Sequence, residues 1–354
     1  MPVTLRDVAK QAGVSVSTAS RALNGRVDVS KEVRSRVLAA AQELSYTVNL
    51  HARVLKGAAT KTLGVILYNT SALTYNATMM SGFYDVATPR GYSLMVYSSQ
   101  ADAELERQAH EMLRQNHVDG VLINSVESGL APLQSLAARN IPFVLLNRRV
   151  KGMACDYVMV DYQRGSYLAA CHLLELGHRR ILYQLGVRTH APTVARLAGY
   201  RQALREYKAP FAPELVVFAG KSPDTYEAVL TAMQRLQPQP TAIMAYNDEA
   251  AIPIYKALND LGLRVPEDVS VVGQNDLSFA PYLTPPLTTI AQAVHEMGRR
   301  GIEILLQKLT WPAGQPWTPQ QVILAPKLTV RQSSARPKAD TAGRAAVVTK
   351  AQNI

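Results

Sequence analysis

Between residues 61 and 272, short apolar stretches alternate with amphipathic stretches of helical length, and this alternation restricts the fold of most of the chain. A repeated strand and helix pattern is typical of an α/β fold, a doubly wound parallel sheet with helices on both faces. The first series of predicted strands comprises Leu63–Leu67, Tyr92–Tyr97, Gly120–Asn124, Phe143–Leu146 and Tyr157–Val160. The second series comprises Ile181–Leu185, Leu215–Phe218, Ala242–Ala245 and Val269–Val272. Two series in succession predict two similar lobes.

Ahead of these lobes, residues 4–25 have the pattern of two short helices joined by a tight turn. Thr4 and Asp7 form a capping-box start, Gly13 ends the first helix, and Ser15 can cap the second. The outward-facing residues of the second helix are Val16, Ser17, Ser20 and Arg21. This arrangement is typical of a helix-turn-helix, which places its second helix in a DNA major groove. An ordinary helical hairpin is the alternative interpretation of this segment taken alone.

A third amphipathic helix is predicted after Ser30, so that residues 1–47 form a small all-α headpiece. The residues predicted to face its core are Leu5, Val8, Ala9, Ala12, Ala19, Ala22, Leu23, Val33, Val37, Leu38, Ala41 and Leu44. Residues 48–60 are too few and too polar to fold alone, although residues 52–56 are compatible with about two helical turns. We therefore interpret residues 48–60 as a hinge or linker between the headpiece and the lobes.

The charge of the chain is unevenly distributed. The formal net charge is +11, and residues 1–60 carry nine Lys/Arg against four Asp/Glu. Residues 331–354 carry five against one, so the long middle is nearly neutral. A basic end on a nearly neutral body is typical of a nucleic-acid-binding module joined to a part that binds something else. The segment from residue 332 is rich in Ala, Ser, Thr and Lys without a leucine heptad, so we predict that residues 332–354 are a disordered tail and that the lobes span residues 61–331.

Several segments together resemble the lac repressor family (LacI family) of transcription regulators, and the resemblance extends through residue 331. They are Thr4–Ala9, Ala12–Ser15, Ser17–Gly25 and residues 46–57. The resemblance implies a periplasmic-binding-protein type I fold with a ligand between the lobes. The segment Pro285–Gln292 matches the family's crossover, after which a helix from Val294 to about Leu309 returns to the first lobe. The sequence departs from the family at Val48, where a proline commonly precedes Asn49.

The resemblance also implies which residues contact DNA. Val16 and Ser17 match base-reading positions, and Arg21 matches a further major-groove position where arginine can pair with guanine. Leu55 matches a hinge leucine that opens a minor-groove step. The full set of predicted DNA contacts is Thr4, Leu5, Ser15, Val16, Ser17, Thr18, Ser20, Arg21, Asn24, Asn49, His51, Ala52 and Leu55.

Candidate ligand contacts stand where predicted strands end, which is where open α/β sheets bind ligands. They are Ser71, Tyr75, Arg148, Asp161, Arg196, Asn247 and Asn275. Of these, Arg196 and Asn247 match the family's effector contacts, and Asn275 replaces its usual aspartate. An asparagine is neutral and can donate a hydrogen bond, which favours a sugar acid or phosphosugar over a neutral sugar. The alternative interpretations are helix caps for Asp161 and Asn247, surface charges for the two arginines and a rim aromatic for Tyr75.

The sequence does not support other classes of protein. Catalytic and nucleotide-binding motifs are absent, so an enzyme is not indicated, and no cofactor is expected. Cys155 and Cys171 lack the spacing of metal ligands, and the amino terminus lacks a signal sequence, so we predict a reduced protein of the cytoplasm without a metal. The sequence predicts a homodimeric repressor of sugar or sugar-acid genes that binds a palindromic operator and is released by an effector. A corepressor-dependent regulator and, from another class, a solute-binding protein are the alternatives.

Overall fold

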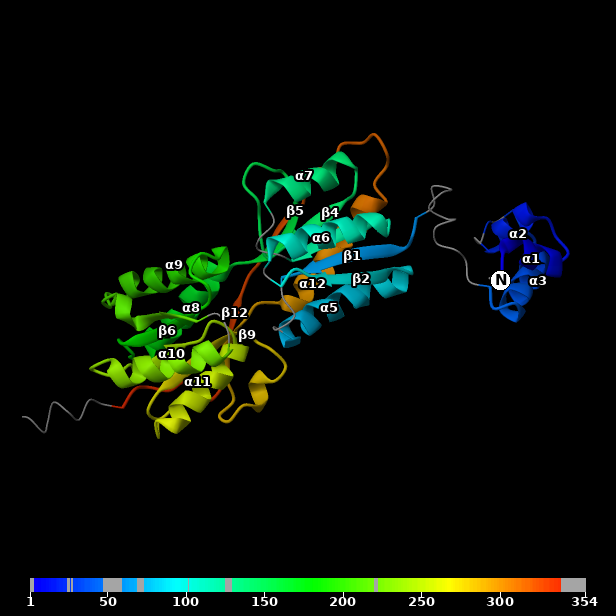
Figure 1. Cartoon of the computed structure of the whole chain (residues 1–354). Coiled ribbons are helices and arrows are strands. Elements are labelled where there is room, and N and C mark those ends of the chain that lie inside the picture. The colour runs from blue at the N-terminus through cyan, green and yellow to red at the C-terminus, as the bar shows by residue number, and fades with distance from the viewer. Residues whose placement is uncertain are drawn as a thin grey trace, which may run out of the picture. The chain divides into compact units, whose positions relative to one another are not determined.

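The chain folds into two compact units, residues 1–60 and residues 61–354, which we describe separately. Figure 1 shows the helices and strands of both units. In the part of the chain that is described, no helix combines the length and apolar character needed to cross a membrane. The computed structural model describes residues 3–23, 26, 28–46, 59–68, 73–100, 102–124, 129–219 and 222–338.

The described residues of the first unit, here called the head, form three helices: α1 (Leu5–Gln11), α2 (Val16–Leu23) and α3 (Lys31–Glu43). The Asp7 carboxylate accepts hydrogen bonds from the backbone N–H and the hydroxyl of Thr4, at 2.8 and 2.7 Å, which fixes the start of α1. The Ser30 hydroxyl accepts from the N–H of Val33 at 3.3 Å and caps α3. The buried residues of the head are Val8, Ala9, Ala12, Ala19, Ala22, Val37, Ala40 and Ala41.

One residue predicted to face the head core does not. Leu38 is 50% exposed, whereas Ala40, which was not predicted, is buried. Successive residues on an α-helix are rotated by about 100°, so the face that contains Val37 and Ala41 passes through position 40 and turns position 38 toward solvent.

The second unit contains two lobes. Lobe 1 consists of residues 61–160 and 294–324, and its six parallel strands lie in the order β11-β5-β4-β3-β1-β2. The strands are β1 (Thr62–Leu67), β2 (Ser93–Ser98), β3 (Gly120–Asn124), β4 (Phe143–Leu146), β5 (Asp156–Val160) and β11 (Gln321–Leu324). The helices are α5 (Leu73–Ala87), α6 (Ala103–Gln115), α7 (Leu130–Ala138) and α12 (Val294–Leu309), with a 3₁₀ turn at Thr88–Arg90.

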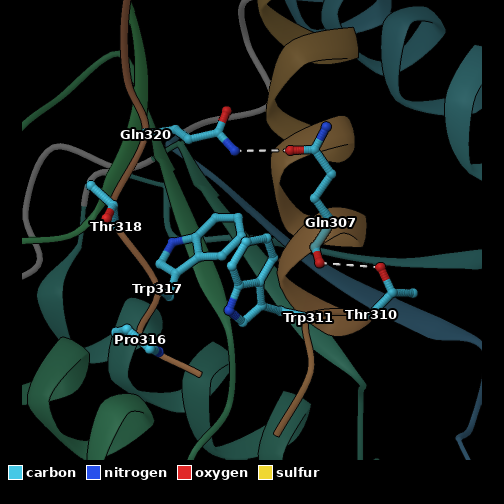
Figure 2. Close-up of a pocket in the computed structure, with 7 residues that line it drawn as sticks. All are labelled: Gln307, Thr310, Trp311, Pro316, Trp317, Thr318 and Gln320. Carbon is cyan, nitrogen blue, oxygen red and sulfur yellow. Dashed lines mark hydrogen bonds between the residues drawn. The ribbon is translucent and has the colours of Figure 1, made fainter. Parts of the chain in front are cut away.

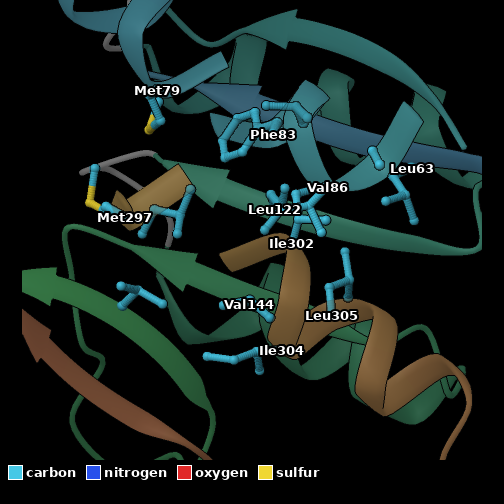
Figure 3. Packing of buried hydrophobic residues seen from close by; sticks show 14 of the residues in the cluster. Leu63, Met79, Phe83, Val86, Leu122, Val144, Met297, Ile302, Ile304 and Leu305 are labelled. Carbon is cyan, nitrogen blue, oxygen red and sulfur yellow. The ribbon is translucent and has the colours of Figure 1, made fainter. Parts of the chain in front are cut away.

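The core of lobe 1 is almost entirely apolar because both faces of its sheet are covered. Helices α5 and α12 pack on one face, where Phe83, Leu122 and Ile302 are fully buried (Figure 3). Helices α6 and α7 pack on the other. Helices α5 and α12 are in close contact at Gly298. A Cβ at this position would lie 2.3 Å from the carbonyl of Met79, so only glycine fits there.

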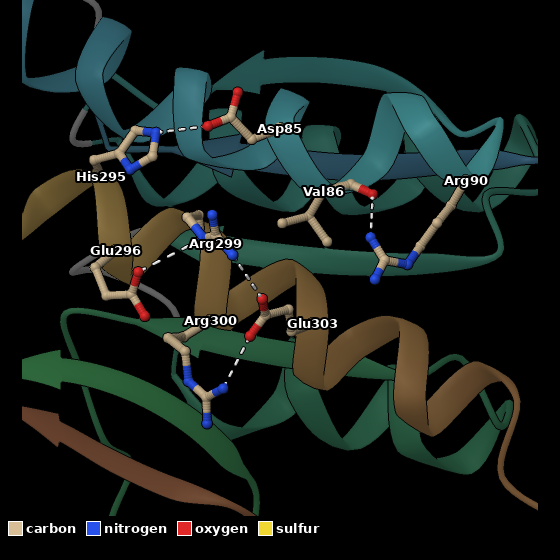
Figure 4. A network of polar contacts seen from close by, with 8 residues as sticks. All are labelled: Asp85, Val86, Arg90, His295, Glu296, Arg299, Arg300 and Glu303. Carbon is tan, nitrogen blue, oxygen red and sulfur yellow. Dashed lines mark hydrogen bonds and ion pairs between the residues drawn. The ribbon is translucent and has the colours of Figure 1, made fainter.

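The outer faces of α5 and α12 carry a polar network. The His295 ring lies 2.9 Å from the Asp85 carboxylate, and Arg300 pairs with Glu303 at 2.9 Å (Figure 4). Most of these side chains are well exposed, and exposed ion pairs contribute little to stability. The network therefore supplements the apolar packing beneath it.

Lobe 2 consists of residues 162–291 and 327–338, with strands in the order β12-β10-β9-β8-β6-β7. All neighbouring strands are parallel except β12, which runs antiparallel to β10. The strands are β6 (Ile181–Leu185), β7 (Val216–Phe218), β8 (Ala242–Met244), β9 (Ser270–Asn275), β10 (Thr288–Ala291) and β12 (Lys327–Thr329). The helices are α8 (Tyr162–Glu175), α9 (Ala191–Glu206), α10 (Ser222–Arg235) and α11 (Asp248–Asp260), with 3₁₀ turns at Pro213–Leu215 and Ala280–Tyr282.

The predicted α/β fold with two parallel-sheet lobes is confirmed, and α12 spans the predicted residues. The predicted disordered tail is wrong for residues 332–338. Ser333 is fully buried, donates to the carbonyl of Val271 at 2.6 Å and accepts from the N–H of Thr288 at 2.7 Å. Composition gave no sign of this segment because its order comes from hydrogen bonds to β9 and β10 rather than from apolar burial. Residues 339–354 lie outside the described part of the chain.

Candidate functional site

Helix α2 presents a small, polar and exposed face. Ser17 and Arg21 are exposed, Val16 is 43% exposed, and Ala19 and Ala22 hold the opposite side of the helix in the core. A face of this kind can approach base edges closely. Arg21 lies 3.5 Å from the Asp28 carboxylate in an ion pair that is well exposed on both sides, so DNA can compete for this guanidinium.

Hydroxyl groups gather at the amino end of α2. The Ser15 hydroxyl accepts from the N–H of Thr18 at 3.1 Å and lies 2.8 Å from the hydroxyls of Ser17 and Thr18. Hydroxyls and backbone N–H groups at a helix start are suited to phosphate oxygens. Thr4 and Leu5 are differently placed, because the Thr4 hydroxyl already donates to its capping partner and Leu5 packs partly into the head core.

Ser20, also on α2, is half-buried. The other predicted DNA contacts lie outside the described residues, as does one predicted ligand contact. These residues are Asn24, Asn49, His51, Ala52, Leu55 and Ser71.

The carboxyl ends of the strands of both lobes lie close together. The Tyr68 ring, after β1, meets the His190 ring before α9 edge to face, with centroids 5.6 Å apart. Glu249, at the start of α11, lies against the start of α5. Burial raises the pKa of Glu249, and hydrogen bonds from the backbone N–H groups of Thr74 and Tyr75 oppose that shift. These contacts bring the predicted ligand residues of the two lobes to one region.

Asn147, directly after β4, is the centre of a hydrogen-bond cluster in this region. Its amide nitrogen donates to the Tyr75 hydroxyl at 2.6 Å and to the Asn124 side chain at 3.1 Å. Its amide oxygen accepts from the Tyr162 hydroxyl at 2.7 Å. Burial raises the pKa of Tyr75 to about 12. Tyr75 is thus partly buried and hydrogen-bonded, not a simple rim aromatic.

Arg196, on α9, is only 3% exposed, which rules out the surface-charge interpretation of this residue. Its Nε donates to the Gln274 side chain at 3.0 Å. Its guanidinium lies 4.5 Å from the ring centroid of Tyr162 and 4.2 Å from that of Tyr246. The arginine is therefore held by neutral and aromatic groups at the carboxyl ends of the lobe 2 strands.

Gln274 connects Arg196 to the interior of lobe 2. Its amide oxygen also accepts from Gln292 at 3.1 Å, and its amide nitrogen donates to the hydroxyls of Tyr183 and Ser166 at 2.9 and 3.3 Å. Gln274 was not predicted from the sequence, and neither were Gln292, Asn147, Tyr162 and Tyr246. Most of these residues adjoin a predicted strand end or a predicted contact, and that position is the signal that could have identified them.

Asn275 ends β9 with φ of 113°, a conformation that L side chains rarely adopt. It is 7% exposed, and its side-chain oxygen has no hydrogen-bond partner among the described residues. The same holds for the side-chain oxygens of Gln292 and Thr193. Buried oxygens without partners cost stability, and such groups are typical of sites that bind a ligand or water.

Two predicted ligand residues cap helices. The Asp161 carboxylate accepts from the N–H of Arg164 at 2.8 Å, and the Asn247 side chain accepts from the N–H of Ala250 at 2.7 Å. Arg148 is half-buried and lies near Cys155, where its charge opposes the rise that burial causes in the pKa of that thiol. The structure thus supports the cap interpretation for two of the residues and does not bring Arg148 into the Arg196 cluster.

Asp248, the first residue of α11, fixes the backbone after Asn275. It is fully buried, and its carboxylate accepts from the N–H of Leu277 at 2.7 Å and from the hydroxyl of Thr289 at 2.5 Å. Burial raises the pKa of Asp248 to about 7. This acid therefore supports the turn that follows Asn275 and β9.

A cavity of about 390 Å³ lies elsewhere on lobe 1, beside the carboxyl end of α12 (Figure 2). Trp311 and Trp317 meet edge to face in its wall, with centroids 5.1 Å apart. The Trp317 indole N–H donates to the buried Asp156 at 2.9 Å, which anchors this wall to β5. None of the predicted ligand residues lines this cavity. In the part of the chain with a described structure, no cluster of His, Cys, Asp and Glu could hold a metal ion.

Residues 4–49 match the family described as bacterial regulatory proteins, lacI family, and residues 170–334 match a periplasmic binding protein-like domain. The ribose operon repressor of Haemophilus influenzae is 33% identical over 333 residues, 93% of this chain and 98% of that protein. The transcriptional repressor PurR of the same species is 34% identical over 337 residues, again 93% and 98%. A crystal structure of the lac repressor dimer bound to operator and the anti-inducer ONPF, 28% identical, has a TM-score of 0.82 over 95% of this chain and 100% of that one.

Proposed function

Because this chain belongs to the LacI family of bacterial transcriptional repressors, we propose that it binds a near-palindromic operator as a homodimer. A small-molecule effector between the lobes then alters its affinity for DNA. Bacterial DNA lies in the cytoplasm, and the repressor acts there. Residues 1–47 read the operator, residues 48–60 form the hinge, and the lobes bind the effector and the second protomer.

The exposed face of α2 supports the DNA part of the proposal. Arg21 is free to exchange Asp28 for guanine, and Val16 can only contact an apolar surface such as a thymine methyl. Leu55 opens a central minor-groove step from the hinge, as the family resemblance implies. Each protomer supplies one recognition helix, so the operator has two half-sites related by symmetry.

Exposed apolar side chains on both lobes support a dimer. Tyr84 on α5 is 49% exposed, Ile252 on α11 is 48% exposed, and Tyr282 in the 3₁₀ turn is 84% exposed. Exposed apolar side chains are candidates for an interface with a second protomer, because association removes them from water. The lac repressor in the operator complex is also a dimer.

The burial of Arg196 without an acidic partner is the observation that carries the effector proposal. A buried cation needs an acceptor, and among the described residues the acceptors at Arg196 are the side-chain oxygen of neutral Gln274 and the hydroxyl of Tyr246, neither of them an acid. A sugar, sugar acid or phosphosugar supplies such an acceptor, with Asn275 orienting its hydroxyls and Asn247, Asp161, Tyr75, Ser71 and Arg148 as further proposed contacts. The ribose operon repressor relative supports a carbohydrate class.

The experiment is footprinting of the full chain on operator DNA selected from random sequence, with and without sugars and sugar acids. We expect a symmetric footprint that an effector weakens by about 5–150-fold, the range of ordinary allosteric coupling. Arg21→Ala should cost about 1–3 kcal/mol per half-site, whereas Arg196→Ala should leave ligand-free binding intact and abolish the ligand response. A footprint on one unpaired half-site would contradict the dimer, and an undiminished response in Arg196→Ala would remove Arg196 from the site. An effector that tightens binding would identify a corepressor instead.

A further inference from the structure

The charge of Arg196 is not neutralised by any group that contacts it in the described part of the chain. Its partners are the amide of Gln274, the hydroxyl of Tyr246 and the rings of Tyr162 and Tyr246. Burial raises the pKa of nearby Tyr75 and Tyr183 to about 12, so these phenols are uncharged at physiological pH. The buried Asp248 does not neutralise Arg196 either. The charges that shift the pKa of Asp248 belong to Asp276 and Arg331, and its carboxylate accepts hydrogen bonds from Leu277 and Thr289. The cluster around Arg196 therefore holds one uncompensated positive charge.

Gln274 is the reason that the charge of Arg196 is held without being neutralised. All the hydrogen bonds of its amide are directed at interior groups, and its oxygen accepts from both Arg196 and Gln292. A glutamate has the same shape and would accept from Arg196 equally well, but it would also neutralise the guanidinium. A glutamine at position 274 thus positions Arg196 through Nε and keeps its positive charge available to a ligand.

The size of the charge limits the ligand. Among the described residues, Arg196 is the only lysine or arginine that is buried. A carboxylate brings one negative charge, which one arginine balances with two parallel hydrogen bonds. A phosphate monoester brings close to two negative charges at neutral pH. One arginine would leave part of this buried negative charge uncompensated, and burying an uncompensated charge is costly in free energy.

The unpartnered oxygens define the rest of the ligand. The Gln292 side chain is tied to Gln274 through its nitrogen, so its free oxygen lies beside the Arg196 cluster. Asn275 follows Gln274 in the chain, and Thr193 precedes Arg196 by one turn on the same helix. Amide oxygens only accept hydrogen bonds, so a ligand that satisfies them must donate, as hydroxyl groups do.

We infer that the effector is a polyhydroxy monocarboxylate, such as an aldonic or uronic acid, and that Gln274 is the residue that selects its carboxylate by holding Arg196 without neutralising it. This inference rests on the proposed effector site and narrows it, because it excludes neutral sugars and phosphosugars as the principal ligands. Gln274 acts through Arg196 and is a positioning residue.

The test is calorimetric titration of the full chain with a panel of hexonates and hexuronates, the matched alditols, and hexose 6-phosphates. The decisive variant is Gln274→Glu, which is isosteric and supplies the missing charge. The matched control is Gln163→Glu, which adds the same charge at an exposed position on α8, where Gln163 bonds only to Gln202. Thermal unfolding of each variant establishes that it is folded.

We expect the wild type to bind at least one carboxylate of the panel tenfold or more tightly than its alditol and than any phosphate. Gln274→Glu should weaken that carboxylate at least thirtyfold and the alditol less than threefold, and Gln163→Glu should change neither by more than twofold. The inference is overturned if no carboxylate binds, if a phosphate or neutral sugar binds more tightly, or if Gln274→Glu weakens charged and neutral ligands equally. If Gln274→Glu does not fold, the ratio of the wild-type affinities for the carboxylate, its alditol and the phosphates decides the ligand class by itself.

Failure of this inference is distinguishable from failure of the proposed effector site. A neutral sugar that releases the operator in an Arg196-dependent manner would uphold the site and reject the monocarboxylate. A ligand response that is unchanged in Arg196→Ala would reject both.

Discussion

Lobe 1 and lobe 2 each contain a six-stranded sheet with two helices on each face, but their interiors differ in polarity. In the described part of lobe 1 the buried polar residues are Ser99, Glu106, His110, Asn124 and Asp156. In the described part of lobe 2, together with Gln292 directly after it, they are Ser166, His178, Gln184, Thr193, Arg196, Thr225, Asp248, Ser270, Gln274, Asn275, Thr288, Thr289, Gln292 and Ser333. The same architecture therefore supports an apolar frame in one lobe and a polar network in the other.

The difference shows how the two lobes divide stability and recognition. Apolar burial in lobe 1 stabilises without requiring any particular partner, whereas each polar group buried in lobe 2 must find a hydrogen bond. Three side-chain oxygens near Arg196 do not find one among the described residues. An unmet buried group costs about 1–3 kcal/mol, so this part of the molecule is less stable than a fully hydrogen-bonded interior would be.

The largest effect should come from the apolar frame. Phe83→Ala in α5 removes a fully buried ring from the face of the lobe 1 sheet, and we expect a loss of about 3–5 kcal/mol in the free energy of unfolding. Urea titration followed by circular dichroism measures it. Leu105→Ala on α6, where the side chain is 37% exposed, is the control and should cost much less. Equal losses for the two variants would mean that lobe 1 is not held by its buried core.

The next effect should distinguish the lobes by pH. The pKa of Asp248 is raised to about 7 in the fold from 3.8, so the protonated acid is favoured by folding. Its contribution is fully present below about pH 4 and is lost as the pH rises through 7, on the order of a few kcal/mol. Asp248→Asn should therefore flatten the pH dependence of unfolding between pH 4.5 and 8.

Thermal unfolding across this pH range measures the effect. The matched control is Glu227→Gln on α10, which removes an exposed acid from the same lobe and should retain the wild-type slope. A wild-type slope in Asp248→Asn would show that the lobe 2 network tolerates the buried carboxylate in its charged form.

The smallest effect concerns the segment that closes lobe 2. Ser333→Ala leaves the buried N–H of Thr288 without its partner, and we expect a cost of about 1–2 kcal/mol together with faster exchange of that amide hydrogen. Hydrogen exchange measured by NMR reports both. Arg336→Ala, an exposed change three residues later, should alter neither quantity. Unchanged exchange in Ser333→Ala would show that residues 332–338 are not an integral part of lobe 2.

The apolar frame was predictable from the sequence, and much of the polar network was not. Gly120–Asn124 and Phe143–Leu146 are continuous apolar runs, so their bounds match the predicted strands. Strand β9 was predicted to end at Val272 but continues through Gln274 to Asn275. Gln and Asn after an apolar run are ordinary loop signals, and only the tertiary partners of Gln274 make it an interior residue.

The two short strands that follow α12, β11 and β12, were not predicted for a related reason. Strands β11 and β12 are half exposed and have four and three residues, too few to show a period-two pattern. At the candidate site, Arg196 could be named only through the family resemblance. Its sequence surroundings do not show that it is buried, whereas Asn147 and Tyr162 gain their importance from contacts between segments that are distant in the sequence.

The way the chain crosses between the lobes also sets an order of events during synthesis. Lobe 1 takes its edge strand from residues 321–324, and lobe 2 is closed by residues 327–338. Neither sheet is complete until the ribosome has passed these residues, which at about 5–20 residues per second takes on the order of 15–60 s after the head has emerged. The head buries its own core and does not need to wait. We expect a nascent chain to carry a folded head for a period in which neither lobe is complete.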